Sequence, residues 1–313
     1  MTDSMQVFDR TLVRRRRDRA AAGFHGADFL LREAANRLTD RLFDVAREFP
    51  LALDLGCHTG QVAEAVAEIA ATKPKIGTLL QADFSEKMAA QARGNGRATL
   101  SADEEFLPIA DDALDLVLSN LSLHWVNDLP GALAQIRRAI KPDGLFLATI
   151  FGGDTLRELR TALLVAEAET SGGVAPRVSP FTDVRDAGNL LTRAGFALPV
   201  VDADSITVTY TDLFKLMADL RAMGETNTVI ERRKIPSRRA TFLRAAEIYQ
   251  ERFCDARGRI NATFQIITMT AWVPHASQQK PLRPGSAKHR LADALKTEEV
   301  ALDEHTPFPA KET

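Results

Sequence analysis

The chain has 313 residues, 45% of them hydrophobic, and a formal net charge of −2. These values allow one large domain or one domain with a helical insertion, and they imply no general affinity for polyanions. Two cysteines, Cys57 and Cys254, are too few for a disulfide scaffold or a cysteine-rich zinc site and indicate free thiols in a reducing compartment. The N-terminus lacks a secretory apolar run and no stretch could span a bilayer, so a cytoplasmic location is expected; the oligomeric state is not indicated.

Residues 1–48 predict a basic arm followed by a helix. The run Arg14 to Arg17 predicts a solvated helix face, with docking on an acidic partner or on nucleic acid as the alternative. Apolar residues from Phe29 to Phe49 follow helical spacing and predict an amphipathic helix that leads into the first strand.

From residue 49 to residue 151, short apolar strands alternate with helices. Strands are predicted at 51–55, 76–82, 98–102, 114–119 and 145–151, and helices at 61–71, 85–93 and 129–140, the last ending before a KPDG turn. This alternation predicts an α/β fold with a parallel sheet that is covered on both faces.

Beyond residue 151 the pattern changes. Helices are predicted at 155–170 and 184–194, and two late strands at 197–210 and 262–272. Between those strands, helices at 212–223 and 237–252 predict a helical cap over about 211–260. The domain at 49–276 is therefore expected to be a doubly wound, mainly parallel, seven-stranded sheet, and the polar residues 277–313 an extended or mobile tail.

Acidic residues follow three of the predicted strands. Asp54 ends the first, and Gly56 and Gly60 let the backbone approach a ligand there. Asp83 follows the second strand, where a carboxylate can accept both hydroxyls of a ribose. The run Asp103-Glu104-Glu105 follows the third and can accept from the exocyclic amine of adenine. This order predicts a site for an adenosine-containing ligand.

The ligand is expected to carry an ammonium group rather than a phosphate. No lysine–serine/threonine pair follows the glycine loop, and Asp54 directs a negative charge toward the region that a pyrophosphate would need. The pattern resembles class I S-adenosylmethionine-dependent methyltransferases. In that family the first acid and the glycines bind the amino-acid part, the second acid binds the ribose, and the third, here Asp103, contacts adenine. His58 departs from the family pattern and is positioned to contact the ligand carboxylate.

Several residues are candidates for the substrate side of the site. Asn120, His124 and Trp125 follow the fourth predicted strand, over the expected methyl position. His124 either acts as a base, orients the substrate, or is a packed, hydrogen-bonded residue of the pocket wall, and Trp125 is interpreted as part of that wall. Asp154 either caps the next helix or pairs with a cationic group such as guanidinium. None of the six histidines shows the close histidine–carboxylate spacing of an iron site, so no metal is predicted.

A narrower resemblance extends almost from end to end. It is carried by FDRTLVRRRRD (8–18), SADEEFLPIADDALDLVLSNLSLHWVNDLPGAL (101–133), KPDGLFLATIFGGDTLRELR (141–160), RVSPFTDVRDAGNLLTRAGF (177–196), LMADLRAMGETN (216–227) and AWVPHASQQKPLRPGSA (271–287). These stretches resemble a family of respiratory complex I assembly factors with a methyltransferase-like fold that act as protein-arginine hydroxylases. The resemblance implies hydroxylation of an arginine in a subunit of the NADH–quinone oxidoreductase.

Two other functions stay open at this point. The biotin-pathway O-methyltransferase, which acts on a malonyl-carrier ester, shares the segment around SNLSLHW (119–125) more loosely. A conventional methyltransferase for a small carboxylic acid or carrier-bound ester is therefore one alternative. The other is a non-catalytic assembly chaperone that retains the fold.

Overall fold

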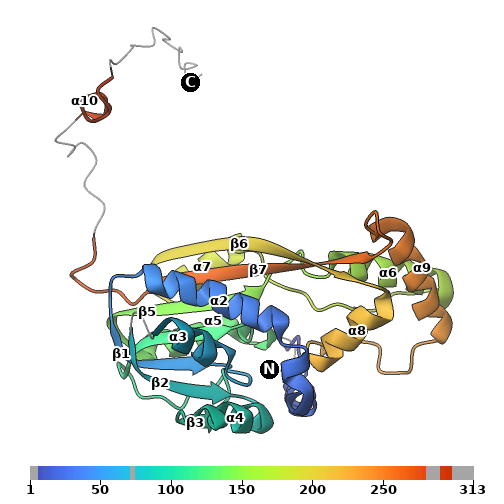
Figure 1. The fold of residues 1–313 in the computed structure, drawn as a ribbon, viewed down its shortest axis with the longest axis horizontal. Coiled ribbons are helices and arrows are strands. Elements are labelled where there is room, and N and C mark those ends of the chain that lie inside the picture. The colour runs from blue at the N-terminus through green and yellow to red at the C-terminus, as the bar shows by residue number, and fades with distance from the viewer. Residues whose placement is uncertain (1–5, 71–74, 280–289, 298–313) are drawn as a thin grey trace, which may run out of the picture. The chain divides into compact units, whose positions relative to one another are not determined.

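A seven-stranded sheet in the order β3-β2-β1-β4-β5-β7-β6 organises the chain, and Figure 1 shows helices on both of its faces. The computed structural model describes residues 6–70, 75–279 and 290–297. Strands β1 to β5 are parallel, whereas β7 is antiparallel to both β5 and β6. The strands are β1 (Phe49–Leu55), β2 (Ile76–Asp83), β3 (Thr99–Ser101), β4 (Leu114–Asn120), β5 (Ile140–Phe151), β6 (Ala197–Tyr210) and β7 (Ile260–Trp272).

Alternate residues of the central strands face two helical layers. In β4, Leu116 and Leu118 pack with α2 and α3, whereas Val117 packs with α5 and α7 on the other face. Both faces are therefore buried, which explains the continuous apolar runs in the sequence and confirms the predicted fold class. The helices of these layers and the sheet edge are α2 (Phe29–Asp44), α3 (Gln61–Ala70), α4 (Glu86–Ala92), α5 (Leu129–Ala139) and α7 (Val184–Arg193).

A helical cap lies at one end of the sheet. It consists of α6 (Arg157–Ser171), which follows β5, and of α8 (Leu213–Ala222) and α9 (Arg239–Phe253), which are inserted between β6 and β7. Helix α6 packs along α9, and Figure 1 shows these helices together beyond the N-terminal end of α2. The late antiparallel strands thus hold the insertion at both of its ends.

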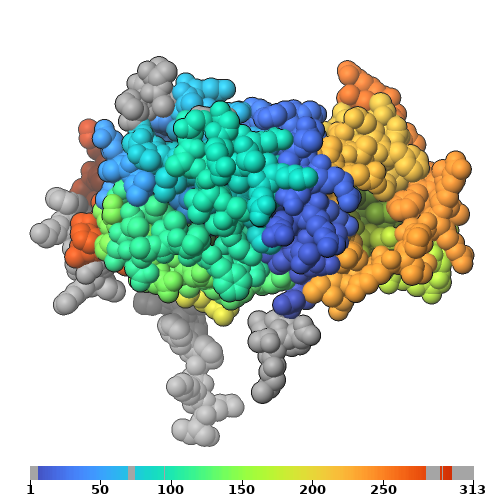
Figure 2. Space-filling view, turned by 90° about the horizontal axis from the view of Figure 1, so that it is seen from below, coloured from blue at the N-terminus to red at the C-terminus, as the bar shows by residue number. Residues whose placement is uncertain are grey.

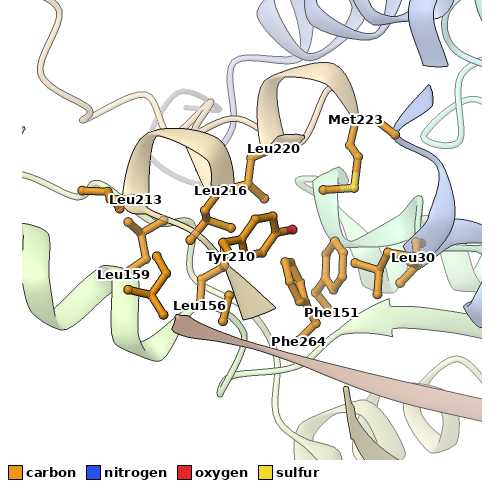
Figure 3. Close-up of a cluster of buried hydrophobic side chains, with 14 of the residues drawn as sticks. Leu30, Phe151, Leu156, Leu159, Tyr210, Leu213, Leu216, Leu220, Met223 and Phe264 are labelled. Atoms are coloured by element: carbon orange, nitrogen blue, oxygen red, sulfur yellow. The ribbon is translucent and has the colours of Figure 1, made fainter. Parts of the chain in front are cut away.

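The cap and the sheet share one hydrophobic core. In Figure 3, Leu216 and Leu220 of α8 surround the ring of Tyr210, next to Phe151 and Phe264 of the sheet. Tyr210 is buried, and its hydroxyl has no hydrogen-bond partner among the described residues. Because this core is continuous, removing the cap would expose apolar surface of the sheet.

The basic arm folds as helix α1 (Arg10–Ala20), followed by the 3₁₀ turn η1 (Ala21–Gly26). Val13 and Arg17 lie on its buried face. One guanidinium nitrogen of Arg17 lies 3.3 Å from Glu104 Oε1, and another donates to Ser122 Oγ at 3.1 Å. The predicted solvated face is therefore wrong for Arg17, because its charge compensates buried carboxylates.

The predicted KPDG turn is a bulge inside β5 rather than a break before it. Asp143 has φ +66°, and the pairing of β4 with β5 shifts register between Leu114 and Leu116. A residue with positive φ inside a strand allows that strand to contain extra residues without ending the hydrogen-bonded ladder to its neighbour. Strand β5 consequently begins five residues earlier than predicted, at Ile140.

The C-terminal residues form a second unit, 276–313, which is described separately from residues 1–275. It contains the short helix α10 (Leu291–Leu295). Most of the predicted tail, at 280–289 and 298–313, lies outside the described residues. The longest described helix, α2, has 16 residues, fewer than the roughly 20 that a membrane span needs, and no described helix is long and apolar enough to cross a membrane.

Replacing Arg17 with methionine should lower the free energy of unfolding by about 3–5 kcal/mol, because the buried Glu104 would lose a countercharge. The matched control is Arg15→Met on the exposed face of the same helix. This variant should change the free energy of unfolding by less than about 0.5 kcal/mol. Chemical denaturation followed by circular dichroism measures both. Equal stability of the two variants would contradict a compensating role for Arg17.

Candidate cofactor and active site

The loop after β1 turns through left-handed backbone at three positions. Gly56 has φ +76°, His58 +49° and Gly60 +105°. A Cβ atom at Gly56 would collide with the side chain of Ser122, so this position requires glycine for space as well as for conformation. The backbone of the loop therefore passes directly beside the end of β4.

Asp54 is a buried carboxylate without a partner. It lies at the end of β1 with no exposed surface, and neither of its oxygens has a hydrogen-bond partner. Burial, with Asp83 nearby, raises the pKa of Asp54 to about 8. Ionised buried carboxylates are stable only with a countercharge, so this geometry fits a cationic ligand group such as an ammonium.

The His58 ring is fixed in the wall of the site. Its Nε2 lies 3.1 Å from the backbone oxygen of Asn120, and its ring stacks on Phe24 with centroids 5.7 Å apart. Burial and the nearby Arg17 lower the pKa of His58 to about 4, so the ring is neutral. Because a carbonyl oxygen only accepts, Nε2 carries the hydrogen and the buried Nδ1 remains an unpaired acceptor.

Asp83 continues the acidic edge at the end of β2. Its two oxygens accept hydrogen bonds from the backbone N–H groups of His58 at 2.9 Å and Ser85 at 2.7 Å. Burial raises the pKa of Asp83 to about 6, although Arg17 at 3.9 Å opposes the increase. The carboxylate is thus held in a fixed orientation next to the glycine loop.

The two candidate acids at the third position, Asp103 and Glu104, differ in burial. Asp103 is partly exposed, whereas Glu104 is fully buried. Arg10 of α1 bridges the two, at 2.5 Å from Asp103 and 2.6 Å from Glu104. Burial alone would raise the pKa of Glu104, but Arg10 and Arg17 beside it lower it to about 2. The structure therefore brings Asp54, Asp83 and Glu104 together, with two guanidinium groups already on the third acid.

Asn120 is committed to structural hydrogen bonds. Its side-chain amide donates to the backbone oxygen of Leu31 at 2.8 Å and accepts from the hydroxyl of Thr149 at 2.7 Å. These bonds tie the end of β4 to α2 and β5. Its predicted role at the methyl position remains a prediction.

His124 is paired with a glutamate that the sequence analysis did not single out. His124 Nε2 lies 3.2 Å from Glu225 Oε2, and Trp125 Nε1 donates to the same oxygen at 2.9 Å. Burial alone would raise the pKa of Glu225, but His124 beside it lowers it. With its Nε2 hydrogen directed at this carboxylate, His124 has a buried, unpaired Nδ1.

Asp154 does not cap a helix. Helix α6 begins after Leu156, which makes no side-chain capping bond. Asp154 is exposed and interacts with Gln265, whose side-chain oxygen accepts from its backbone N–H at 3.2 Å. The capping prediction is therefore wrong, because the chain makes a further turn before the helix starts; the catalytic role of Asp154 remains a prediction.

A cavity of about 410 Å³ lies between the sheet, α1 and the cap. Trp125 and Glu225 line it, together with apolar residues of β5, β7 and the cap helices; neither Asp54 nor Asp154 does. The acids of the glycine loop therefore lie outside the cavity lining, and His124 contacts the lining through Glu225. Within the described residues, no group of three or more histidine, cysteine, aspartate or glutamate side chains could hold a metal ion.

Comparison with known proteins places the sheet in a common fold. Residues 53–148 match the family model described as a methyltransferase domain. The YcgJ protein of Bacillus subtilis superposes with a TM-score of 0.53 at 14% identity, over 76% of this chain and 98% of that one. A methyltransferase-like protein from Bacillus halodurans gives the same TM-score at 18% identity, over 76% of this chain and 99% of that one. These similarities confirm the class I methyltransferase fold.

Full-length relatives narrow the assignment. The chain is 44% identical to the mitochondrial arginine-hydroxylase NDUFAF5 of Danio rerio, over 96% of this chain and 93% of that protein. It is 46% identical to the protein of the same name from Homo sapiens, over 91% of this chain and 82% of that protein. The chain belongs to the arginine-hydroxylase NDUFAF5 family. The resemblance that the motifs indicated is confirmed.

Family membership also bears on two expectations from the sequence, the cytoplasmic location and the chaperone alternative. The NDUFAF5 proteins are named as mitochondrial, so the predicted cytoplasmic location is contradicted. A malonyl-[acyl-carrier protein] O-methyltransferase of Methylovorus sp. is 34% identical, over 90% of this chain and 95% of that protein. Both sets of relatives are named as enzymes, so this NDUFAF5 relative is an enzyme of methyltransferase fold and the chaperone alternative is dropped.

Three residues of the site were missed from sequence, Arg10, Arg17 and Glu225. A signal existed for the arginines, because Arg10, Val13 and Arg17 recur at helical spacing on one face of α1. No local pattern marks Glu225, whose partner His124 is 101 residues away.

Asp54→Asn should stabilise the ligand-free NDUFAF5-family protein near pH 8. The pKa of Asp54 is about 8 when folded and about 3.9 when unfolded. Its stabilising contribution is therefore complete below about pH 4 and is lost as the pH rises to about 8. Thermal unfolding at pH 8 should show a gain of roughly 1–3 kcal/mol, with little gain near pH 4. The exposed Asp40→Asn is the control, and a pH-independent difference between the two variants would refute this assignment.

Proposed function

We propose that this protein binds S-adenosylmethionine and modifies a protein substrate by hydroxylating an arginine of a subunit of the NADH–quinone oxidoreductase. The observation that supports arginine hydroxylation is the 44% identity to a protein named as an arginine-hydroxylase, over 93% of that protein's length. The partner is inferred from the near end-to-end resemblance in the motifs, which includes the cap and the segment that carries Glu225.

The cofactor is supported by Asp54, whose buried, unpaired carboxylate fits an ammonium group. In this proposal Gly56, His58 and Gly60 hold the amino-acid part, and Asp83 accepts the ribose hydroxyls. The adenine end is formed by the acidic pair at 103–104 together with Arg10, which already joins them. When bound, S-adenosylmethionine supplies an electrophilic methyl group on a sulfonium, which is the chemistry of the second candidate function.

The substrate end is proposed at His124 and Glu225. Glu225 contributes the carboxylate among the residues that line the cavity, so it replaces the exposed Asp154 as our preferred partner for a substrate guanidinium. His124 is held by the same carboxylate and presents Nδ1 as an acceptor that can take a proton. Hydroxylation replaces one hydrogen of arginine by a hydroxyl group; with dioxygen as oxygen source, its second atom leaves as water and a reductant supplies two electrons.

A second candidate function is O-methylation of a carrier-bound carboxylic acid. The specific observation in its favour is the 34% identity over 95% of the malonyl-[acyl-carrier protein] O-methyltransferase. The same cofactor residues would serve both reactions, so the product distinguishes them.

Titration calorimetry should detect binding of S-adenosylmethionine or S-adenosylhomocysteine. Asp54→Asn should weaken it by about tenfold or more, because the ammonium loses a charge-assisted bond. Asp83→Ala should weaken it by roughly 1–3 kcal/mol through loss of the ribose bonds. Asp40→Asn should bind as the parent does. Absence of heat with both ligands at millimolar concentration would refute the cofactor assignment.

Mass spectrometry of a co-expressed partner subunit identifies the reaction. We expect one arginine-containing peptide to gain one oxygen atom, because the host cell supplies both oxidant and reductant. Glu225→Gln should lower the modified fraction by about tenfold or more, since it removes the guanidinium partner, whereas Asp154→Asn should not. A larger loss with Asp154→Asn would restore Asp154 as partner. Methylation of a carrier-bound ester, with every arginine unchanged, would favour the second function.

A further inference from the structure

The cavity beneath the cap is lined by an excess of positive charge. Six of its lining residues are arginines, and Glu225 is its one lining carboxylate. Glu225 is already engaged by His124 and Trp125. Figure 2 shows the surface hollowed between the blue N-terminal residues and the orange residues of the cap, where this cavity opens.

Carboxylates outside the lining compensate only part of this charge. Arg177 and Arg233 share Glu167, at 2.5 Å and 3.4 Å. Arg232 pairs with Asp9 at 3.3 Å. Half of the cavity's guanidinium groups are therefore accounted for by two carboxylates.

The other three arginines have no acidic partner in the described part of the chain. Arg16 donates to the backbone oxygen of Asn227. Within residues 6–70, 75–279 and 290–297, no carboxylate lies within ion-pair distance of Arg16, Arg19 or Arg221. Burial lowers the pKa of Arg16, and its neighbours Arg232, Arg19 and Arg221 lower it further, whereas the carboxylate of Asp9 only partly opposes them. Like charges held this close are stabilised by an anion between them.

Apolar side chains form much of the remaining lining, beside the uncharged polar residues Thr155, Ser179, Thr226 and Asn227. Phe151 and Phe264 come from the sheet, and Leu159, Met217 and Phe242 from the cap. A small inorganic anion would leave these surfaces unfilled, whereas an apolar group next to the anion would bury them. The cavity is therefore complementary to a ligand with an anionic head and an apolar body.

We propose that this cavity binds a carboxylate carried on an apolar body, with Arg16, Arg19 and Arg221 as its partners. The planar guanidinium fork matches the geometry of a carboxylate. This site is separate from the acids at the glycine loop, and binding there requires neither the cofactor nor the proposed reaction. Two sources share this chemistry, a free organic acid and an acidic side chain of a protein that is flanked by apolar residues.

Calorimetry with hexanoate at low salt tests the site on the full chain. We expect binding with a Kd of about 1 mM or below, and at least about tenfold weaker binding of acetate, which lacks the apolar body. Hexylamine, with the same chain and opposite charge, should not bind. Equal binding of hexanoate and hexylamine would overturn the proposal.

A pair of double variants locates the site. Arg19→Gln/Arg221→Gln removes two exposed, unpaired cations and should weaken hexanoate binding by about tenfold or more. Arg15→Gln/Arg185→Gln makes the same change in net charge at exposed positions outside the cavity lining and should bind hexanoate as the parent does. If both double variants bind hexanoate equally well, the proposal is wrong.

Competition against hexanoate identifies the source of the carboxylate. Displacement by the blocked peptide acetyl-Ala-Leu-Glu-Leu-Ala-amide, but not by its Gln counterpart, supports the site and indicates an acidic protein side chain. Displacement by pentanedioate and not by the acidic peptide supports the site and indicates a free acid. Failure of both to displace hexanoate overturns the proposal. Every probe in this test measures binding and none measures the reaction. The anion site can therefore be refuted while arginine hydroxylation is confirmed, and arginine hydroxylation can be refuted while the anion site is confirmed.

Discussion

Compensation of buried negative charge is the constraint on which this structure depends. Three strand ends direct Asp54, Asp83 and Glu104 into one water-poor region, where ionised carboxylates are costly without cations nearby. Helix α1 supplies Arg17 and Arg10 to the outer two positions. Asp54 receives neither, and it is the acid at which the amino-acid end of a class I cofactor would lie. Of these three acids, Asp54 alone has no hydrogen-bond partner among the described residues, and the proposed function assigns a ligand cation to it for that reason.

The sheet, the cap insertion and the three acidic positions could be predicted because their signals are local. An apolar run, a glycine turn and the acid that follows a strand are neighbours in sequence, and parallel strands bring their carboxyl ends to one edge. The partner of each acid could not be predicted in this way. Arg17 reaches Glu104 across 87 residues, and Glu225 reaches His124 across 101. Such pairs depend on how α1 and the cap pack, which no short pattern in the sequence specifies.

The cap contributes both to the hydrophobic core and to the lining of the cavity. Its helix α8 fills the core around Tyr210 with one face, and the residue that follows its buried Leu220, Arg221, lines the cavity. A cap that is built into the core has a fixed position over the sheet, which suits recognition by preset charges. The polarity of the cavity then matters for substrate choice. We expect the substrate guanidinium group to bind at Glu225. The arginines of the cavity are then expected to attract acidic residues that lie next to it in the substrate.

Successive residues of helix α1 contact two different sites. Arg17 is directed at the acids of the glycine loop, while Arg16 and Arg19 line the cavity. Since a short helix moves as a rigid body, a ligand that displaces Arg17 also displaces its two neighbours. If the two proposed sites both bind their ligands, such a displacement would change the affinity of one site when the other is occupied, and thermodynamic linkage would make the effect equal in both directions. One turn of helix would then couple the two proposed sites.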